Sequence, residues 1–335
     1  MPLRRKRLRV DEKTLSKDIS GNVYIVTGAN SGVGLETTRQ LVKQGGHVIM
    51  ACRRPDAAEE VAKSFTGLKG SYEVMRLDLA DLQSVKDFIT EFLKKYEKLD
   101  GLMCNAGLVT DSKLSRTKDG LETTIGVSYF GHFLLTELLP DVLKKSAPSR
   151  MAIVSSVVHA GNEQNRPKVH LEDLNYHTRE FNNFAAYAEA KVANILYAME
   201  LAQRLEGTGV TTASVHPGWA RSNFGRNMSG GMRIMMGIMR VGMAILFPLH
   251  RYLTDSNEDS AQTSLHCLLS DEAPQHSGAY FSQSSRLYND REYREGGWPM
   301  TSPNPNARDM ETAKKLVEMS YEIVGLNKKE YPREV

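Results

Sequence analysis

The stretch Asn22-Val-Tyr-Ile-Val-Thr-Gly-Ala-Asn-Ser-Gly-Val-Gly-Leu35 decides the fold of this chain. Its residues 23–26 form a short, β-branched apolar run, which predicts a buried strand. A glycine-rich turn follows, and residues 35–43 have the pattern of a helix. Strand, turn and helix in this order bring backbone N–H groups and the positive end of a helix together, so the stretch suits a pyrophosphate.

The three glycines of this turn have separate expected roles. Gly28 permits the tight turn, Gly32 a close approach of the backbone to a ligand, and Gly34 close packing of the helix on the strand. The same spacing also occurs in ordinary loops, so the turn needs support from the rest of the chain. The other candidate cofactor-binding residues of this turn are Thr27, Asn30, Ser31 and Val33.

Length, charge and cysteine content narrow the class of protein. The 335 residues suffice for one large α/β domain or two small ones. A net charge of +3 is too small to imply a nucleic-acid partner. Cys52, Cys104 and Cys267 show no paired spacing, which indicates free thiols in a reducing, intracellular compartment and no metal site.

The chain begins with a basic segment, Leu3-Arg-Arg-Lys-Arg-Leu-Arg9. No apolar stretch follows it, which argues against a secretory signal or an N-terminal membrane anchor. We expect residues 1–19 to be a basic and polar extension. A solvated tail, a membrane-surface contact and a targeting remnant are all compatible with this composition.

Strands alternate with helices along the chain. The apolar runs predict strands at residues 23–26, 46–51, 72–77, 99–104, 151–154, 210–215 and 278–281. Helical patterns follow at residues 35–43, 55–64, 82–93, 121–145, 185–205, 258–269 and 308–324. This alternation, without a repeat or linker, predicts one doubly wound, parallel α/β sheet of about seven strands with helices on both faces, in a single domain of residues 20–335. The polar regions 161–183 and 282–306 are expected to be irregular.

The segment of residues 228–253 differs from the rest of the chain in composition, because it is rich in methionine and small apolar residues. It is compatible with a core helix or with an adaptable apolar lid over a substrate. Arg233, Arg240 and two nearby glycines argue against a membrane-spanning helix. Because ligands in such sheets bind beyond the carboxyl ends of the strands, its place after the sixth strand favours a substrate lid at residues 219–257.

Tyr187 and Lys191 lie four positions apart, on one face of a predicted helix. A nearby ammonium is expected to lower the pKa of the phenol, which makes Tyr187 a candidate acid and base for a carbonyl or alcohol. Ser156, at the end of the fifth strand, could hold the same oxygen. The plain alternative is a half-buried tyrosine beside a solvated lysine, with a serine in a turn.

Taken together, these motifs resemble the short-chain dehydrogenase/reductase family over about residues 20–280. The matching motifs, in order, are Thr27-Gly28…Gly32…Gly34, Asp78, Asn105-Ala106-Gly107, Ser156, Tyr187…Lys191 and Pro217-Gly218. The resemblance implies a Rossmann-type dehydrogenase domain. It also implies cofactor contacts from Asp78-Leu79, with the Asp78 side chain on the adenine amino group, and from the Asn105-Ala106-Gly107 backbone, Pro217-Gly218 and Ser222.

The resemblance also implies catalytic roles. Tyr187 would be the acid/base, Ser156 would steady the substrate oxygen, and Lys191 would hold the nicotinamide ribose. The family's Asn-x-x-Gly-His-Phe motif is here Ser128-Tyr-Phe-Gly131-His-Phe133. Ser128 thus replaces an asparagine that anchors a proton-relay water in the family, and this departure leaves a catalytically weak, NADP(H)-binding sensor or scaffold as an alternative.

The residues after the second strand, Cys52-Arg53-Arg54, bear on the choice of cofactor. An NAD enzyme usually has an acidic residue here for the ribose hydroxyls, and this chain has none. Arginines suit a 2′-phosphate through charge-assisted hydrogen bonds. NADP(H) is therefore the expected cofactor.

Within the family, His47-Val-Ile-Met-Ala-Cys-Arg53 and Ser155-Ser-Val-Val-His159 resemble the retinol dehydrogenase and WW-domain oxidoreductase branch. Residues 72–80 and 313–320 are similar to light-dependent protochlorophyllide reductase. Trp219 and Ala193 stand where that enzyme has cysteines, so a tetrapyrrole reductase is the alternative function. We expect a large, lipophilic substrate such as a retinoid, steroid or isoprenoid. The same apolar surface would suit a homo-oligomer or a peripheral membrane contact, so the expected location is cytoplasmic or peripherally membrane-associated.

Overall fold

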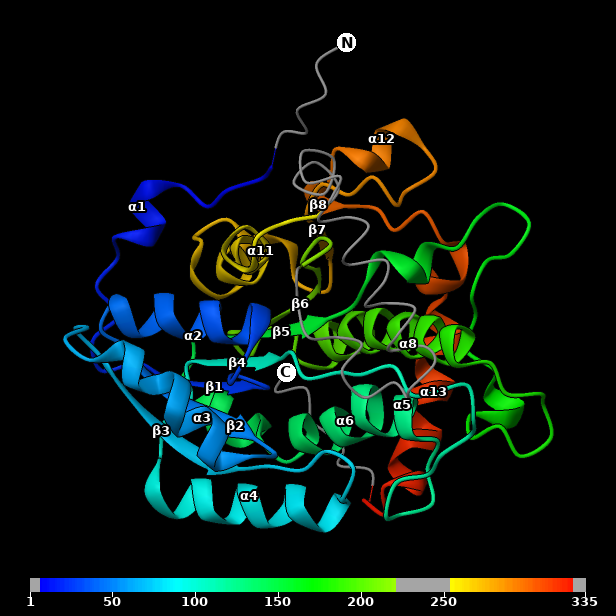
Figure 1. Ribbon diagram of the computed structural model, residues 1–335, viewed down its shortest axis with the longest axis horizontal. Helices are drawn as coiled ribbons and strands as arrows, with labels where there is room; N and C mark the ends of the chain where they lie inside the picture. Colours follow the sequence, from blue (N-terminus) through cyan, green and yellow to red (C-terminus); the bar gives the residue numbers. More distant parts are fainter. Residues whose placement is uncertain (1–6, 221–253, 328–335) are drawn as a thin grey trace.

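The computed structural model describes residues 7–220 and 254–327. All of its strands join one eight-stranded sheet in the order β3-β2-β1-β4-β5-β6-β7-β8 (Figure 1). The first seven strands of this order are parallel, and β8 pairs with β7 antiparallel. The predicted doubly wound parallel α/β sheet with helices on both faces is therefore confirmed, with one additional strand.

The strands are β1 (Val23–Thr27), β2 (His47–Cys52), β3 (Ser71–Arg76), β4 (Gly101–Cys104), β5 (Ser149–Val154), β6 (Val210–His216), β7 (Tyr280–Ser282) and β8 (Gly297–Met300). The helices are α1 (Glu12–Leu15), α2 (Gly32–Lys43), α3 (Pro55–Ala62), α4 (Leu82–Lys95), α5 (Thr123–Ile125), α6 (Gly131–Glu137), α7 (Pro140–Lys145), α8 (Asn183–Arg204), α11 (Asn257–Leu269), α12 (Arg291–Arg294) and α13 (Met310–Ile323). Short 3-10 turns are η1 (Lys63–Phe65), η3 (Val157–Ala160), η4 (Leu171–Asp173), η5 (Ala273–His276) and η6 (Pro305–Arg308), and η2 (Gly126–Phe130) is a π-turn.

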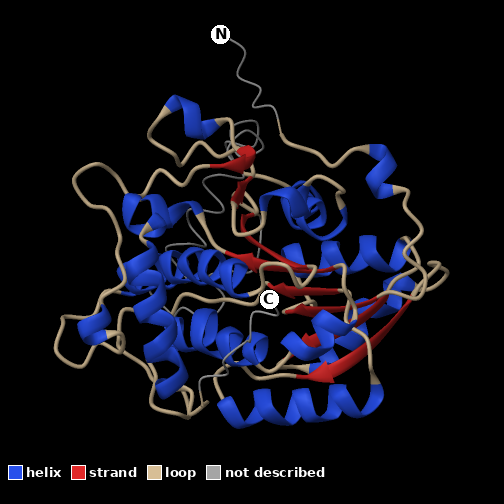
Figure 2. Cartoon of the chain, turned by 180° about the vertical axis from the view of Figure 1, so that it is seen from behind, coloured by secondary structure: helices blue, strands red, loops and turns tan. Residues whose placement is uncertain are grey.

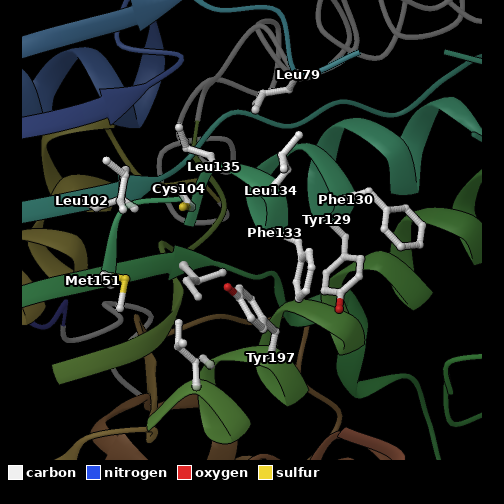
Figure 3. Close-up of a cluster of buried hydrophobic side chains, with 14 of the residues drawn as sticks. Leu79, Leu102, Cys104, Tyr129, Phe130, Phe133, Leu134, Leu135, Met151 and Tyr197 are labelled. Carbon is white, nitrogen blue, oxygen red and sulfur yellow. The ribbon is translucent and has the colours of Figure 1, made fainter. Parts of the chain in front are cut away.

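Two hydrophobic cores lie on opposite faces of the sheet, because successive strand residues point to opposite sides. Ile25 of β1 belongs to the core shared with α4, α6, α8 and α13, whereas Tyr24 and Val26 belong to the core shared with α2, α3 and α11. Figure 2 shows the strands enclosed between these helical layers. Aromatic rings fill the first core, where Tyr129 of η2, Phe133 of α6 and Tyr197 of α8 pack against one another (Figure 3).

The helix expected over residues 121–145 is confirmed in part: it runs without a gap over residues 123–137, includes a π-helical stretch, and is interrupted before Pro140. The segment divides into α5, the π-turn η2, α6 and α7. Pro140 explains one break, since it has no N–H for an upstream carbonyl and instead occupies the first turn of α7. Gly131 lets the start of α6 approach the turn after β3 closely: a Cβ there would lie 2.6 Å from the carbonyl oxygen of Leu79.

Part of the segment expected to be irregular, residues 282–306, forms the eighth strand. Tyr280 pairs with Met300, and Ser282 with Gly297. Pro299 cannot donate to a sheet partner, which restricts such a strand to the edge position that β8 occupies. The glycine and proline content concealed this strand in the sequence.

The described part of the basic extension is not a solvated tail. Arg7 Nε lies 3.0 Å from Asp255 Oδ1, and Arg9 Nη2 lies 2.5 Å from Asp259 Oδ1. Both carboxylates are buried at the start of α11, where a charge needs a partner. Val10 is buried beside them. The extension is therefore packed against the fold from Arg7 onward.

Most of the proposed lid falls outside the described residues, including the methionine-rich segment 228–253 and Ser222. At its two ends, Ala220 and Asp255 form a parallel bridge. The three cysteines are free, and all three are buried. Across residues 7–220 and 254–327, no helix has the length and apolar character needed to cross a bilayer.

Candidate active site

A cavity of about 480 Å³ opens at the carboxyl ends of the parallel strands. It lies where the winding of the sheet reverses between β1 and β4, the usual ligand position in doubly wound sheets. It brings together most of the residues predicted from the sequence. Those lining it are Gly28, Asn30, Ser31, Gly32, Val33, Arg53, Arg54, Asp78, Leu79, Asn105, Ala106, Gly107, Ser156, Tyr187, Lys191, Pro217 and Gly218.

The turn after β1 is shaped by backbone conformation. Gly28 (φ +66°) and Gly32 (φ +58°) adopt left-handed conformations that glycine accepts readily. Ser31 precedes α2, and its side chain makes no capping hydrogen bond in the described structure. The first N–H groups of α2 are thus not capped by Ser31 at the cavity edge. This cradle fits a pyrophosphate.

Two predicted residues, Thr27 and Gly34, lie behind the cavity wall rather than in it. Thr27 Oγ1 accepts hydrogen bonds from the backbone N–H groups of Asn105 (2.8 Å) and Ala106 (2.9 Å). A Cβ on Gly34 would lie 2.6 Å from both Asn105 Nδ2 and the Gly28 carbonyl oxygen. These residues join the turns after β1 and β4. His132, which sequence reasoning did not single out, contacts Thr27 Oγ1 through Nε2 at 2.9 Å.

The end of the cavity near β2 and β3 carries charged side chains. Arg53 and Arg54 are exposed, and neither forms an ion pair with another described residue. One oxygen of the Asp78 carboxylate accepts the N–H of Ala80 at 3.0 Å, which fixes the orientation of the side chain. The two free guanidinium groups give this end of the cavity a positive character.

At the other end, β5 and α8 bring Ser156, Tyr187 and Lys191 together. The side chains of Tyr187 and Lys191 are buried, and Lys191 Nζ lies 5.4 Å from the centre of the Tyr187 ring. Lys191 Nζ donates to the carbonyl oxygen of Val154 at 2.9 Å. Ser156 is hydrogen-bonded to Tyr187. The four-residue spacing on one helix face therefore delivers the expected juxtaposition.

The expected lowering of the Tyr187 pKa is wrong for the protein alone. Burial raises the pKa of Tyr187 above its usual value, and the hydrogen bond with Ser156 offsets this only in part. Burial also lowers the pKa of Lys191 to about 7. Desolvation disfavours the charged form of both groups. Tyr187 is thus a protonated phenol at neutral pH, the form that can give a proton to a carbonyl oxygen.

Ser128 lies outside the cavity lining, in the π-turn η2, and is fully buried. Its Oγ has no hydrogen-bond partner among the described residues. A Cβ on Gly107 would lie 3.5 Å from both Ser128 Oγ and Lys191 Nζ, so the two groups flank the same glycine. Buried hydroxyls without a protein partner are suited to binding water. π-Turns of this kind often mark functional positions.

Sequence reasoning missed several residues of the cavity wall. His216 lines it, and its Nδ1 accepts the N–H of Val157 at 3.2 Å. Its position directly before Pro217-Gly218 was the available signal. The apolar side chains of Val158 and Leu287 also line the cavity and are 37% and 47% exposed. Leu287 lies after β7, in a segment where no sequence pattern pointed to the site.

Comparisons with known proteins identify relatives of this chain. Residues 22–167 match the family model described as short chain dehydrogenase. Retinol dehydrogenase 13 from Homo sapiens is 37% identical over 312 residues, which cover 92% of this chain and 86% of the relative. Retinol dehydrogenase 11 from Mus musculus is 39% identical over 287 residues, covering 84% of each chain.

Solved structures share the architecture. An uncharacterized protein from Mycobacterium paratuberculosis superposes with a TM-score of 0.70 at 27% identity, covering 94% of this chain and 97% of that protein. A gluconate 5-dehydrogenase from Beutenbergia cavernae with bound NADP has a TM-score of 0.59 at 21% identity, covering 79% and 96%, and shows the same fold. The chain therefore belongs to the short-chain dehydrogenase/reductase family, as a retinol dehydrogenase-like oxidoreductase that acts on CH–OH and C=O groups.

Proposed function

We propose that the protein interconverts an alcohol and a carbonyl on a large apolar substrate, with NADP(H) as cofactor. One observation carries the proposal. A single cavity has Ser156, Tyr187 and Lys191 at one end and two free arginines at the other. When bound, the nicotinamide supplies or accepts the hydride.

The cofactor preference rests on Arg53 and Arg54. Their guanidinium groups are exposed at the cavity and are not neutralised by described acidic residues. Guanidinium groups bind phosphate through charge-assisted, often bidentate hydrogen bonds. A 2′-phosphate on the cofactor would provide such a partner, whereas the ribose hydroxyls of NAD(H) would not.

The proton chemistry is assigned to three side chains. Tyr187, protonated at neutral pH, gives its proton to the substrate carbonyl oxygen in the reducing direction. Ser156 holds the same oxygen by a hydrogen bond. Lys191, whose pKa is lowered to about 7, is positioned behind Tyr187 by the Val154 carbonyl. Ser128, flanking the same glycine as Lys191, would hold a water on the path that returns the proton.

The apolar substrate is supported by the mouth of the cavity. Val158 and Leu287 line it and are substantially exposed, and Trp219 joins the same wall. Fully burying one such side chain is worth roughly 1.5–3 kcal/mol. Relatives named as retinol dehydrogenases, at 36–39% identity, fit a substrate of this class.

Cofactor titration tests the first half of the proposal. NADPH should bind at least about tenfold more tightly than NADH, which corresponds to one charge-assisted hydrogen bond. Arg53→Asp should remove this preference. Arg291→Asp, the same charge change outside the cavity lining, should keep it. Equal or tighter binding of NADH by the unmodified protein would refute the NADP(H) assignment.

A substrate panel tests the second half. Apolar aldehydes and ketones, a retinoid among them, should be turned over with a higher kcat/KM than small polar carbonyls, followed by NADPH absorbance. Better turnover of the small polar compounds would refute the lipophilic assignment. No turnover with tight NADPH binding would favour an NADP(H)-binding sensor, the reading that the Ser128 replacement suggests.

A further inference from the structure

One peptide group in the site, the one between Ser156 and Val157, is gripped at both ends by histidines. Its C=O accepts a hydrogen bond from His159 Nδ1 at 2.6 Å. Its N–H donates to His216 Nδ1 at 3.2 Å. Both rings are buried, His159 completely. The backbone next to the candidate catalytic serine therefore has two side-chain anchors from different parts of the chain.

The two rings must carry their protons on different nitrogens. A carbonyl oxygen can only accept, so His159 holds its proton on Nδ1 and its Nε2 accepts from Ser302 Oγ at 2.8 Å. A backbone N–H can only donate, so His216 Nδ1 is unprotonated. Burial lowers the pKa of His159 to about 4, which keeps this ring neutral at pH 7. The peptide thus selects one tautomer of each ring.

Two tyrosines brace the histidines from behind. The His159 ring packs edge-on against Tyr280 with the centroids 4.9 Å apart, and His216 packs edge-on against Tyr288 at 6.1 Å. The hydroxyls of Tyr280 and Tyr288 are hydrogen-bonded at 2.7 Å. The rings that hold the two ends of the peptide are therefore linked through one buried tyrosine pair.

The Ser156 hydroxyl has two competing partners. It is bonded to Tyr187, and it also accepts, at a long 3.5 Å, the N–H of Val158 in its own turn. If the plane of the Ser156–Val157 peptide could reorient, the Val158 N–H could approach the Ser156 hydroxyl and draw it away from Tyr187, as at the starts of many turns. Fixing that peptide favours the orientation toward Tyr187.

We propose that His159 and His216 are positioning residues: they clamp the Ser156–Val157 peptide and so aim the Ser156 hydroxyl at the reacting oxygen. The inference rests on the proposed role of Ser156. Neither histidine takes part in the proton transfer. His159 does not line the cavity, and it acts only through the peptide and the segment that follows β8.

The test compares His159→Leu with His159→Asn in the full chain. Leucine fills similar space without a donor, whereas the amide N–H of asparagine can replace Nδ1–H. We expect kcat with an apolar aldehyde and NADPH to fall by up to about tenfold in His159→Leu, as for one lost hydrogen bond, and to recover largely in His159→Asn. The Kd for NADPH should stay within about twofold in both variants, since His159 lies outside the cavity.

A Ser156→Ala background separates positioning from mere stabilisation. There, His159→Leu should lower kcat no further, because the hydroxyl it aims is gone. An equal fall in both backgrounds, or an unchanged kcat in a folded His159→Leu protein, would overturn the clamp. If Ser156→Ala alone kept full activity, the proposed function would fail instead.

Ser302→Ala provides a second route if His159→Leu does not fold. It removes the partner of His159 Nε2 and leaves the peptide contacts in place. We expect a smaller fall in kcat, again absent in the Ser156→Ala background. An unchanged kcat in a folded Ser302→Ala protein would contradict the role of this ring.

Discussion

The two turns that border the cavity are built in different ways. The turn after β1 is formed by its own backbone, with Gly28 and Gly32 in left-handed conformations and Gly34 packed against Asn105. The turn after β5 is held by side chains from β6 and from the segment after β8, through His216 and Ser302. The conformation of the first turn is therefore set mainly by residues close together in the sequence. The conformation of the second turn depends on contacts between residues far apart in the sequence.

The largest expected effect concerns another contact between residues far apart in the sequence, at the ends of α6 and α8. Arg204 Nη2 lies 2.5 Å from Glu137 Oε1, and Arg204 Nη1 donates to Tyr321 on α13 at 3.1 Å. Glu137 is buried, so Arg204→Met leaves a carboxylate without its cation. We expect a loss of about 3–5 kcal/mol in the free energy of unfolding, measured with urea.

The matched control is Lys315→Met, which removes an exposed ion pair with Glu311 on the same α13. It should change the free energy of unfolding by no more than about 1 kcal/mol. Similar losses in the two variants would mean that the buried Arg204–Glu137 pair, which joins α8 to α6, contributes no more to stability than an exposed ion pair.

Gly34→Ala tests the local half. A Cβ would meet Asn105 Nδ2 and the Gly28 carbonyl, both at 2.6 Å, so the two turns must separate. We expect a loss of about 1–3 kcal/mol in stability and a much weaker affinity for NADPH. Gly67→Ala is the control, because Gly67 has a left-handed φ but open space around it. It should lower stability and leave NADPH affinity unchanged; an equal loss of affinity in both would contradict the packing role of Gly34.

The pH dependence of the free energy of unfolding tests whether Lys191 is neutral in the folded protein. Between pH 7 and 8.5, Lys191 is protonated when unfolded but loses its proton in the folded protein, since burial lowers its pKa to about 7. The unfolded state therefore binds more protons, and stability rises with pH by up to about 1.4 kcal/mol per pH unit. Lys191→Met should flatten this rise in urea unfolding, and Lys315→Met should not. An unchanged slope in Lys191→Met would show that the lysine stays charged in the folded protein.

The smallest effect concerns the basic extension. Arg7 pairs with Asp255, whose other carboxylate oxygen accepts the N–H of Trp219 in the cavity wall at 3.0 Å. Arg7→Ala should raise the KM for an apolar substrate a few-fold, because Trp219 loses a fixed support. Arg9→Ala is the control, since Arg9 is more exposed and pairs with Asp259. Equal effects of the two changes would show that the extension contributes only general stability.

The features that could be predicted from the sequence are those set by residues close together in the chain. The apolar run of β1 and the glycine spacing predicted the first turn, because strand and turn preferences act between adjacent residues. The strand β8 escaped prediction, since only its pairing with β7 makes an extended segment of Gly297 and Pro299. Likewise, helical spacing placed Lys191 beside Tyr187, but burial, which decides both pKa values, comes from the assembled fold.

The clamp on Ser156 was beyond sequence reasoning for the same reason. His159 and Asn304 are 145 positions apart, and the Asn304 side chain donates to the His159 carbonyl at 2.6 Å. No local pattern connects them. The sequence identified Ser128 only as a departure from a family motif. The structure adds that its hydroxyl is buried without a described hydrogen-bond partner and that, like Lys191 Nζ, it lies beside Gly107.

The most direct test of the central claim is the rate of hydride transfer in Tyr187→Phe, with NADPH affinity measured in the same protein. Phenylalanine keeps the ring and removes the proton that the carbonyl oxygen needs. We predict that kcat falls by at least about 100-fold while the Kd for NADPH stays nearly constant. Full activity in a folded Tyr187→Phe protein would contradict the assignment of Tyr187 as the acid/base, whatever the substrate.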